Sequence, residues 1–479
     1  MKNLNTTTDD ARLRELGYQP QFKRALGLFA DFSLGYSYMS PIAGFYALFA
    51  YALTTAGPSF FWTMPLVLLG HTLVALVFAE SSSQYPIAGG VYQWARQLAG
   101  PKFGFLTGWM YLLALIGTIA GLAAGVAPYL GPLLGIGGGT FFNAVSGIAM
   151  VVLAAVLNLI GTKTLGRVTE LGVWAGLIGL LVCGVYLLLF ARLQPFSVLY
   201  ESFGAGEGNR TGALLAASLI GIWIFFGHES CGDLAEEVKD ASVKVPRAMM
   251  LTMIVGGVSA LIIALGMILA VPDMAAAVSG KAGNIAEVVL TNAFGAIGAK
   301  AMLLCLLVVV LSATVSVVAS ASRLLFSLGR DNLIFGSSLM RKIDEKRGLP
   351  IAAVVVATLI PCFIVFCGLF APDAATAIIS FATAGIYTAF AMVVLAALFA
   401  RLGGWVPAGP FKLRGWGWPV TIAGLIFEVA AVINIVWPRP PTPDTSFFMT
   451  YLIPIVLIVV FVLGLVQLGN PALQRKEHE

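Results

Sequence analysis

Ser40-Pro41-Ile42-Ala43-Gly44 interrupts an apolar run that extends from about residue 25 to about residue 56. Proline lacks a backbone N–H and its ring clashes with the preceding helical turn, so a helix breaks there, and glycine loosens the same turn. Backbone groups that are freed inside a membrane must face protein or a wet cavity. A helix broken at mid-depth presents the partial charges of its two ends to a ligand, which predicts a binding site. A simple proline kink is the structural alternative.

A second apolar run, near residues 220–237, is interrupted by Phe226-Gly227-His228-Glu229-Ser230. Paired interruptions in corresponding segments of two halves are typical of transporters that are built from inverted repeats. The two breaks together therefore favour a binding site at mid-membrane over two unrelated kinks.

The composition is that of a polytopic membrane protein. Of the 479 residues, 59% are hydrophobic and 11% are charged, which is about half the charged fraction of soluble domains. A spanning helix needs about 20 apolar residues, and the chain has room for about twelve. The first ~20 residues are polar and lack the apolar core of a cleavable signal peptide. The five cysteines show no paired spacing, so we expect neither a disulfide framework nor a metal site.

The apolar segments predict an all-α polytopic membrane protein with twelve spans. We expect these at residues 25–56, 59–82, 103–129, 141–160, 166–192, 212–238, 248–271, 299–328, 350–370, 375–400, 417–437 and 448–468. This number of spans puts both termini on one side of the membrane. The loops on that side hold 23 of the Lys and Arg residues and the opposite loops hold 5, so the positive-inside rule predicts cytoplasmic termini. The topology also explains the net charge of +5, and we expect no nucleic-acid partner.

The segment between the second and third predicted spans is too polar and too rich in glycine to cross a membrane. It reads Glu80-Ser81-Ser82-Ser83-Gln84-Tyr85-Pro86-Ile87-Ala88-Gly89-Gly90-Val91-Tyr92-Gln93-Trp94-Ala95. The order and spacing of its glutamate, Tyr-Pro, Gly-Gly, tyrosine and tryptophan resemble the cytoplasmic motif of the amino acid–polyamine–organocation (APC) transporters. Further matches follow in the order that this family has them: Lys244-Val245-Pro246-Arg247-Ala248, Ser322-Arg323, Gly329-Arg330-Asp331-Asn332 and Gly409-Pro410-Phe411-Lys412.

Gly227 together with Asp233-Leu234-Ala235-Glu236-Glu237 is most similar to the amino acid/choline transporter branch of the family. Members of that branch carry amino acids, GABA, choline and related amines. The resemblance implies a LeuT-like fold with a five-plus-five inverted repeat, in which the first and sixth spans are broken and the last two spans lie outside the repeats. It divides the chain into a cytoplasmic tail (1–23), a transporter core (24–400), two further helices (401–468) and a second cytoplasmic tail (469–479).

The first break offers candidate substrate contacts at Ser40, Ile42, Ala43 and Gly44. The N–H groups of Ala43 and Gly44 are placed to meet a substrate carboxylate, and the carbonyl groups before Pro41 are placed to meet an ammonium group or a coupling cation. Related APC transporters hold the carboxylate of an amino acid at a glycine-rich break here. Because Pro41 removes one donor, substrates without a carboxylate, such as choline or ethanolamine, become easier to accommodate.

The second break adds Trp223, Phe226, Gly227, His228 and Glu229 as candidates. An ionisable group at membrane depth indicates function by default, so we expect Glu229 to pair with a substrate ammonium group or to take up a coupled proton. Bonding to the unwound backbone is its structural alternative. His228 is a second proton candidate because imidazole titrates near neutral pH; a hydrogen-bonded structural role is its alternative.

An indole face attracts an organic cation. In similar exchangers of basic amino acids a tryptophan at the position of Trp223 contacts the substrate, whereas helix packing is the common fate of aromatic residues. In the third span, Trp109 and Tyr111 are placed to reach the same site.

Charged residues near the cytoplasmic end of the sixth span predict an inner gate of salt bridges. Asp233 and Glu237 lie on this helix, and Arg247 and Arg323 lie nearby in the topology. A solvated run of charges is the alternative. Two other ionisable residues lie inside apolar spans: we expect His71 to donate a hydrogen bond between helices, and Glu428, outside the repeats, to pair with another helix or subunit.

These features predict a secondary active transporter in the plasma membrane that imports a small amino acid or organic amine by alternating access. Proton coupling through Glu229 is preferred, although sodium stays open because Gly176 stands where several similar APC transporters carry a lysine at the sodium position. An obligate exchanger without ion coupling is the nearest alternative, and a ligand-binding membrane sensor is the alternative from another class. No nucleotide motif or metal cluster indicates an enzyme or a cofactor.

Overall fold

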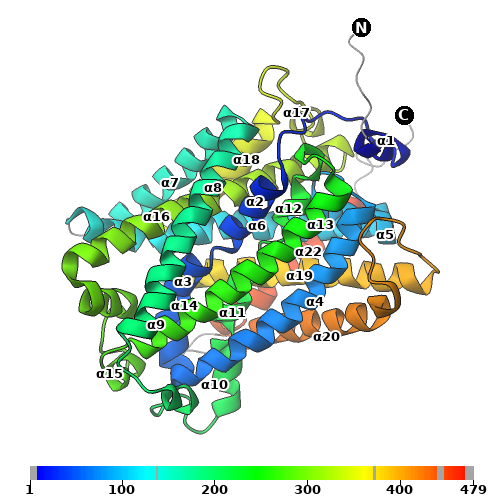
Figure 1. Cartoon of the computed structure of the whole chain (residues 1–479). Coiled ribbons are helices and arrows are strands. Elements are labelled where there is room, and N and C mark those ends of the chain that lie inside the picture. Colours follow the sequence, from blue (N-terminus) through cyan, green and yellow to red (C-terminus); the bar gives the residue numbers. More distant parts are fainter. Residues whose placement is uncertain (1–7, 136–138, 371–373, 440–446, 470–479) are drawn as a thin grey trace.

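The computed structural model describes residues 8–135, 139–370, 374–439 and 447–469, and within these ranges the chain is mostly helical with no named strand (Figure 1). Residues 1–7 of the predicted N-terminal tail, and the predicted C-terminal tail from residue 470, lie outside the described residues. The α-helices are α1 (Thr8–Glu15), α2 (Leu28–Met39), α3 (Pro41–Ala56), α4 (Thr63–Gln84), α5 (Gly90–Ala99), α6 (Pro101–Leu134), α7 (Thr140–Ile160), α8 (Thr162–Gly179), α9 (Leu187–Phe190), α10 (Arg210–Ala217), α11 (Leu219–Ile224), α12 (Ser230–Asp233), α13 (Ala241–Leu251), α14 (Gly257–Leu269), α15 (Met274–Val278), α16 (Ile285–Arg330), α17 (Ser337–Met340), α18 (Ile351–Cys367), α19 (Ala374–Leu402), α20 (Gly417–Val436), α21 (Phe447–Thr450) and α22 (Leu452–Leu468). Short 3-10 or π-helical turns are η1 (Gly57–Trp62), η2 (Leu180–Tyr186), η3 (Phe196–Tyr200), η4 (Ala235–Glu237), η5 (Thr252–Gly256), η6 (Gly368–Phe370) and η7 (Arg414–Trp416).

Every predicted span coincides with a helix or a broken helix. Eight stretches of the described chain are long and apolar enough to cross a membrane, and the first, Leu28–Gln84, contains both the first and the second predicted spans. Shorter apolar helices stand at the sixth, ninth and twelfth predicted positions, at Arg210–Ile224, Ile351–Cys367 and Leu452–Leu468. The all-α polytopic class is therefore confirmed, whereas twelve crossings stay a prediction.

Both predicted breaks are present. α2 ends at Met39 and α3 begins at Pro41, with Ser40 between them at φ 44°. α11 ends at Ile224 and α12 begins only at Ser230, and between them Gly227 has φ 123°.

The two breaks touch each other. A Cβ atom on Gly227 would lie 2.5 Å from the backbone nitrogen of Met39 and 2.9 Å from its Cα atom. Those distances are shorter than non-bonded atoms tolerate, so only glycine fits at this crossing. Two helices that are distant in the sequence therefore meet backbone to backbone at their broken turns.

The two segments are also joined by backbone hydrogen bonds where the stretch before α2 meets the stretch after η4. The N–H groups of Ala25 and Leu26 both donate to the carbonyl of Glu237 at 2.9 Å, and the N–H of Lys239 donates to the carbonyl of Leu26 at 3.0 Å. Leu26 and Val238 form a parallel β-bridge there. The first and sixth spans are thus fixed to each other at mid-depth and again at the end of the helices.

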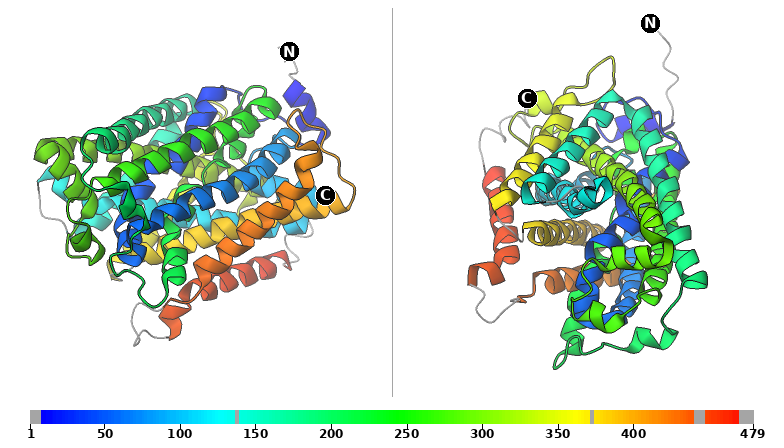
Figure 2. Two further views of the ribbon diagram at one scale, coloured as in Figure 1. Left: turned by 60° about the horizontal axis from the view of Figure 1, so that its bottom comes forward. Right: turned by 90° about the vertical axis from the view of Figure 1, so that its left-hand side faces the viewer.

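The broken helices lie inside the bundle. α3 contacts α11, α14 and α16, and α2 contacts α8, α13 and α16. α20 (orange) and α22 (red) lie along one side of the bundle (Figure 2), where α20 packs on α4 and α19 and α22 packs on α6 and α19. This position agrees with a core made of the first ten spans, a division of the chain that stays a prediction.

The seventh span begins earlier than predicted, at Ala241 rather than at residue 248, and runs through η5 into α14. Pro246 lies inside α13 and cannot donate to the carbonyl of Ser242. The hydroxyl of Ser83 donates to that carbonyl instead, at 2.8 Å. The polar motif segment after the second span thereby satisfies the backbone group that the proline leaves free.

We predict that Gly227→Ala lowers the stability of the folded protein strongly. A positive φ costs a non-glycine residue roughly 1–2 kcal/mol, and the overlap of the new methyl group with Met39 adds to that cost. The matched control is Gly404→Ala, because Gly404 has φ 84° but no other atom lies within 4 Å of the place that its methyl group would take. Melting temperatures of both purified variants measure the difference, and equal values would show that the breaks are not in backbone contact.

Candidate substrate and proton site

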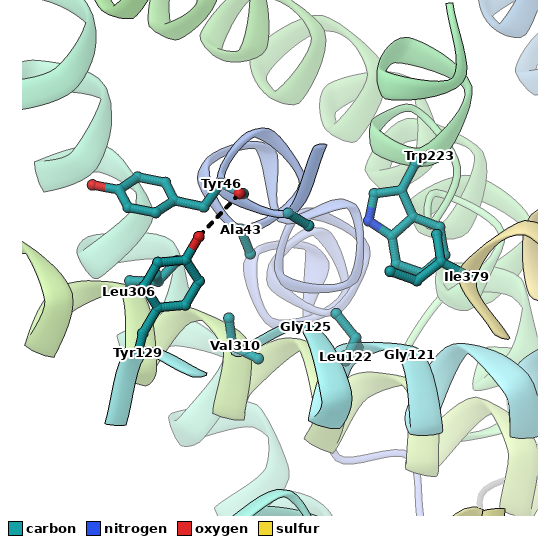
Figure 3. A pocket seen from close by; sticks show the side chains of 11 residues that line it. Ala43, Tyr46, Gly121, Leu122, Gly125, Tyr129, Trp223, Leu306, Val310 and Ile379 are labelled. Carbon is teal, nitrogen blue, oxygen red and sulfur yellow. Dashed lines mark hydrogen bonds between the residues drawn. The ribbon is translucent and has the colours of Figure 1, made fainter. Parts of the chain in front are cut away.

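A pocket opens beside the first break, between α3, α6, α11, α16 and α19 (Figure 3). The cavity is narrow, with a volume of about 20 Å³. Two of the predicted contact residues, Ala43 and Trp223, line it. The other lining residues are Tyr46, Ala47, Gly121, Leu122, Gly125, Tyr129, Leu306, Val310 and Ile379. The pocket is therefore mostly apolar with aromatic side chains around it, as an organic ligand requires.

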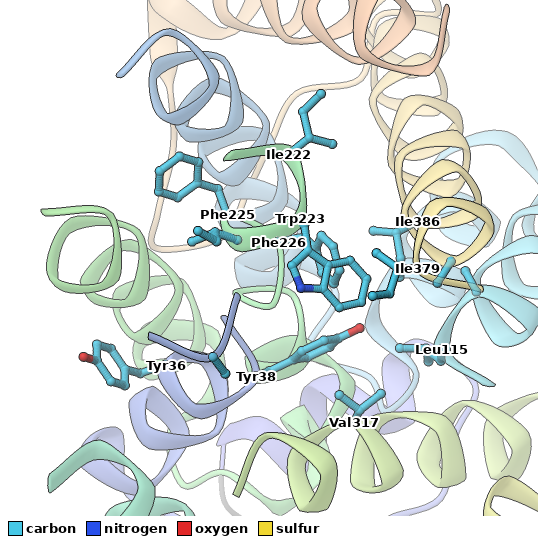
Figure 4. Close-up of a cluster of buried hydrophobic side chains, with 14 of the residues drawn as sticks. Tyr36, Tyr38, Leu115, Ile222, Trp223, Phe225, Phe226, Val317, Ile379 and Ile386 are labelled. Carbon is cyan, nitrogen blue, oxygen red and sulfur yellow. The ribbon is translucent and has the colours of Figure 1, made fainter. Parts of the chain in front are cut away.

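Trp223 stands across the pocket from Tyr129, whose hydroxyl donates to the carbonyl of Tyr46 at 3.2 Å (Figure 3). The ring of Phe226 meets the ring of Trp223 edge to face, with their centres 5.4 Å apart (Figure 4). It meets the ring of Tyr38 in the same way, with their centres 5.7 Å apart. Residues from both breaks thus form one aromatic wall. Trp223 is the one of these three rings that lines the pocket, and an indole face suits the recognition of an organic cation.

The first break offers fewer free donors than predicted. The N–H of Gly44 donates to the carbonyl of Ser40 at 3.0 Å as α3 begins. The expectation that this N–H meets a substrate carboxylate is therefore wrong, because the group is already bonded. Pro41 has no N–H, which leaves those of Ile42 and Ala43 as the free donors of the first turn.

The side chains at this break are also placed differently. A Cβ atom on Gly44 would lie 2.6 Å from Cγ1 of Ile224, so Gly44 serves the close packing of α3 against α11. The side chain of Ile42 packs against Gly179 of α8, and the hydroxyl of Ser40 is buried. Of the four predicted contacts in the first break, Ala43 is the one that lines the described pocket.

Glu229 lies wholly buried at the second break and joins a small polar network. Its Oε2 accepts the backbone N–H of Gly227 at 2.7 Å. The hydroxyl of Tyr111, from α6, lies 3.4 Å from the other oxygen, Oε1, and donates to Oδ2 of Asp233 at 2.9 Å. The bond from the Gly227 N–H matches the structural alternative for Glu229, which was bonding to the unwound backbone. The other carboxylate oxygen, Oε1, faces the hydroxyl of Tyr111. Tyr111 links the two carboxylates, a pairing that the sequence did not indicate.

Trp109, the other candidate from the third span, points away from the site. Its indole N–H donates to the carbonyl of Val460 in α22 at 2.9 Å. His228 is wholly buried, with Nδ1 at 3.8 Å from Oε2 of Glu229, which is too far for a direct hydrogen bond. Its ring packs against Phe78 and Phe390.

Two ion pairs join η4 to α16. Nε of Arg323 lies 2.7 Å from Oε1 of Glu237, and Arg330 lies 2.8 Å from Oε1 of Glu236. Asp233 bonds to Tyr111 and not to an arginine. Arg247 is on the exposed side of α13 and belongs to no ion pair of the described ranges. The prediction that these last two residues share the salt bridges is therefore wrong; whether the observed pairs act as a gate stays a prediction.

The segment before α2 covers these pairs. The guanidinium of Arg330 lies 4.1 Å from the ring centre of Tyr18, and the hydroxyl of Tyr18 donates to Gln93 at 3.1 Å and to Asp331 at 3.2 Å. Burial, with the nearby carboxylate of Asp331, raises the pKa of Tyr18 to about 12. The hydroxyl therefore stays a donor at neutral pH, and this contact does not titrate in the physiological range.

Sequence reasoning missed Asp31 in α2. Its side chain is wholly buried, and neither carboxylate oxygen has a hydrogen-bond partner among the residues that the structure describes. The signal was an aspartate inside an apolar run, which is the same signal that singled out Glu229.

Comparison with known proteins decides the family. A profile of the family described as amino acid permease matches residues 26–461. The chain belongs to the amino acid permease family. The permease is thus a multi-pass membrane transporter of amino acids or amines and not an enzyme, and the resemblance to the APC transporters is confirmed.

Relatives cover nearly the whole permease. It is 28% identical to the amino-acid permease BAT1 of Arabidopsis thaliana, over 92% of this chain and 90% of that protein. It is 22% identical to the GABA-specific permease of Saccharomyces cerevisiae, over 93% of this chain and 81% of that protein. It is 23% identical to the thiamine transporter thi9 of Schizosaccharomyces pombe, over 92% and 82% respectively.

A solved structure shares the fold. The permease matches the crystal structure of a manganese transporter of Eremococcus coleocola with a TM-score of 0.59 and 12% identity, over 94% of this chain and 96% of that one. This likeness confirms the LeuT-like fold and carries no information on substrate.

We predict that Arg323→Met destabilises the permease more than the double change Arg323→Met with Glu237→Gln. Removing one partner of a buried ion pair leaves the other charge uncompensated, at a cost of about 3–5 kcal/mol, and both side chains are almost fully buried. Melting temperatures of the two variants and of Glu237→Gln complete the cycle. Losses of stability that add, so that the double variant loses as much as the two single variants together, would show that the two residues are not coupled.

Proposed function

We propose that the permease imports a small amino acid or organic amine, such as GABA or choline, across the plasma membrane with the cytoplasmic side holding both termini. Substrate binds in the pocket between the two breaks. Rocking of the first, second, sixth and seventh spans against the rest exposes the pocket to each side in turn, and a proton accompanies the substrate.

The burial of Glu229 at the crossing of the two breaks carries this proposal. The basic group nearest to this carboxylate within the described ranges is the imidazole of His228, at 3.8 Å, which is charged only when it is protonated, and no Lys or Arg of these ranges forms an ion pair with Glu229. An ionised carboxylate is costly to hold in a low-dielectric interior unless a cation or a proton neutralises it. Because Glu229 is not among the residues that line the pocket, uptake of a proton is better supported than direct contact with an amine.

The aromatic wall supports the amine class. Trp223 lines the pocket and stands against Phe226, and a cation over such a ring gains about 0.5–2 kcal/mol. Two relatives, a GABA-specific permease and a thiamine transporter, are named after substrates that carry a cationic nitrogen. The same class of ligand suits this pocket.

The substrate is tested by thermal stabilisation of the purified permease against amino acids, GABA, choline, ethanolamine, polyamines and thiamine, since a ligand that binds the folded state raises its apparent stability. We expect a shift with an amine that is reduced in Trp223→Ala, because the indole face contributes about 0.5–2 kcal/mol to the binding of a cation. Trp416→Ala is the matched control, because Trp416 is 73% exposed and far from the pocket. A shift of equal size in wild type and Trp223→Ala would contradict the assignment of the pocket.

Coupling is tested in proteoliposomes with the compound that gives the largest shift. We predict that Glu229→Gln abolishes accumulation driven by an imposed pH gradient and keeps counterflow at equal pH, because the amide still accepts the N–H of Gly227 but binds no proton. Accumulation that follows a sodium gradient in wild type would replace the proton by sodium. Counterflow without any gradient-driven accumulation would make the permease an obligate exchanger.

A further inference from the structure

A second ionisable cluster lies behind the broken sixth span. It consists of His71 on α4 and Glu428 on α20, together with His228 in the break itself, and all three side chains are wholly buried. α20 belongs to the pair of helices at the side of the bundle (Figure 2). The cluster therefore joins the site at the breaks to a helix that contributes nothing to the described pocket.

The cluster forms a continuous series with Glu229. Nδ1 of His71 lies 3.8 Å from Oε1 of Glu428. The rings of His71 and His228 meet edge to face with their centres 5.1 Å apart, and Nδ1 of His228 lies 3.8 Å from Oε2 of Glu229. Each nitrogen–oxygen gap is slightly longer than a hydrogen bond, a separation that a bridging water or a small side-chain rotation closes.

Two members of the cluster lack partners. Both ring nitrogens of His71 and both carboxylate oxygens of Glu428 have no hydrogen-bond partner among the described residues, whereas the ring of His228 also faces the backbone of Phe225. The expectation that His71 donates a hydrogen bond between helices is therefore not met. It does face Glu428, for which a pairing with another helix or subunit was predicted without a named partner. Buried polar groups without partners cost several kcal/mol by order of magnitude.

The surroundings of the cluster are aromatic. His71 packs against Tyr387, Phe390 and Phe427. The Tyr387 hydroxyl, which α19 contributes beside the pair, already donates to the carbonyl of Ile222 at 3.0 Å. The remaining titratable neighbours are His228 and Glu229 on the break, with Tyr111 and Asp233 beyond them. No Lys or Arg of the described ranges forms an ion pair with the cluster.

We propose that His71 and Glu428 form a second proton-binding site and that His228 carries the proton between this site and Glu229. In the transfer the O–H bond of the Glu428 carboxyl breaks as an N–H bond forms on His71. An N–H bond of the His71 imidazolium then breaks as one forms on His228, and an N–H bond of His228 breaks as an O–H bond forms on the carboxylate of Glu229, so that both imidazoles end neutral. The number of protons is unchanged, and a carboxylate is left at Glu428. This role deepens the proposed proton coupling and rests on it for its part in transport.

Infrared spectra of the purified permease in lipid, recorded while the pH is changed, test the site without any substrate. We expect a carboxylic acid C=O band that changes with pH, disappears in Glu428→Gln and persists in Glu170→Gln. The latter is the matched control, because Glu170 is a half-buried glutamate of α8 away from the cluster. His71→Phe, which suits the aromatic surroundings, should change the pH at which the band is lost. A spectrum that is identical in wild type and Glu428→Gln, or a band that His71→Phe leaves unchanged, overturns the proposal.

Transport of radiolabelled GABA in proteoliposomes tests the coupling. We expect Glu428→Gln and His71→Phe each to lower accumulation driven by a pH gradient by about tenfold, a factor within the range that a typical coupling free energy gives. Counterflow at equal pH should continue. Unchanged accumulation, or an equal loss of counterflow, overturns a role in proton transfer. If wild type accumulates no GABA under a pH gradient, the proposed function fails for that compound, and the infrared result alone decides the proton site.

Discussion

The contact between Gly227 and the backbone of Met39 is the constraint on which the rest of the site depends. With no Cβ atom at Gly227, the two broken turns approach to a distance that no other residue allows. The crossing brings Tyr38 beside Phe226 and sets Glu229 within reach of Tyr111. Because the breaks leave backbone groups without helical partners, the carboxylate that accepts the N–H of Gly227 is part of the structural solution as well as of the chemistry.

Polar contacts, and not close backbone packing, join the two broken segments at the end that holds η4. There the ends of the two broken segments share backbone hydrogen bonds, and Arg323 and Arg330 pair with Glu237 and Glu236. Ion pairs that are buried to this extent add little net stability, but each is costly to break in half. Such a set of ion pairs is stable when every partner is in place, and displacing one partner of a pair costs free energy. That behaviour suits an element with two discrete arrangements. A separation of the two broken segments at this end would break both pairs and the β-bridge at Leu26 together.

Sequence reasoning located the elements better than the contacts. Both breaks, the buried motif segment and the pocket positions of Ala43 and Trp223 follow from local chemistry: proline and glycine interrupt helices, and aromatic or ionisable residues stand out in apolar runs. The bond between Tyr111 and Asp233 and the approach of His71 to Glu428 depend on which helices become neighbours. Local patterns in a single sequence do not reveal those neighbours. The N–H of Gly44 was assigned to substrate because the register of the new helix, which begins at Pro41, was unknown.

Charge and depth together limit what this permease binds. The wholly buried carboxylates are Asp31, Glu229, Asp233 and Glu428, and within the described ranges none of them pairs with Lys or Arg. Buried carboxylates that have no Lys or Arg partner favour protons and cationic groups over anions in their surroundings. A zwitterionic amino acid then needs separate donors for its own carboxylate, and the free N–H groups of Ile42 and Ala43 are the ones that the first turn of α3 provides. A quaternary amine needs only the aromatic wall. The two substrate classes therefore differ in the use that they would make of α3. In the proposed function, the choice between amino acid and amine rests on the first break, and the proposed proton site lies at the second.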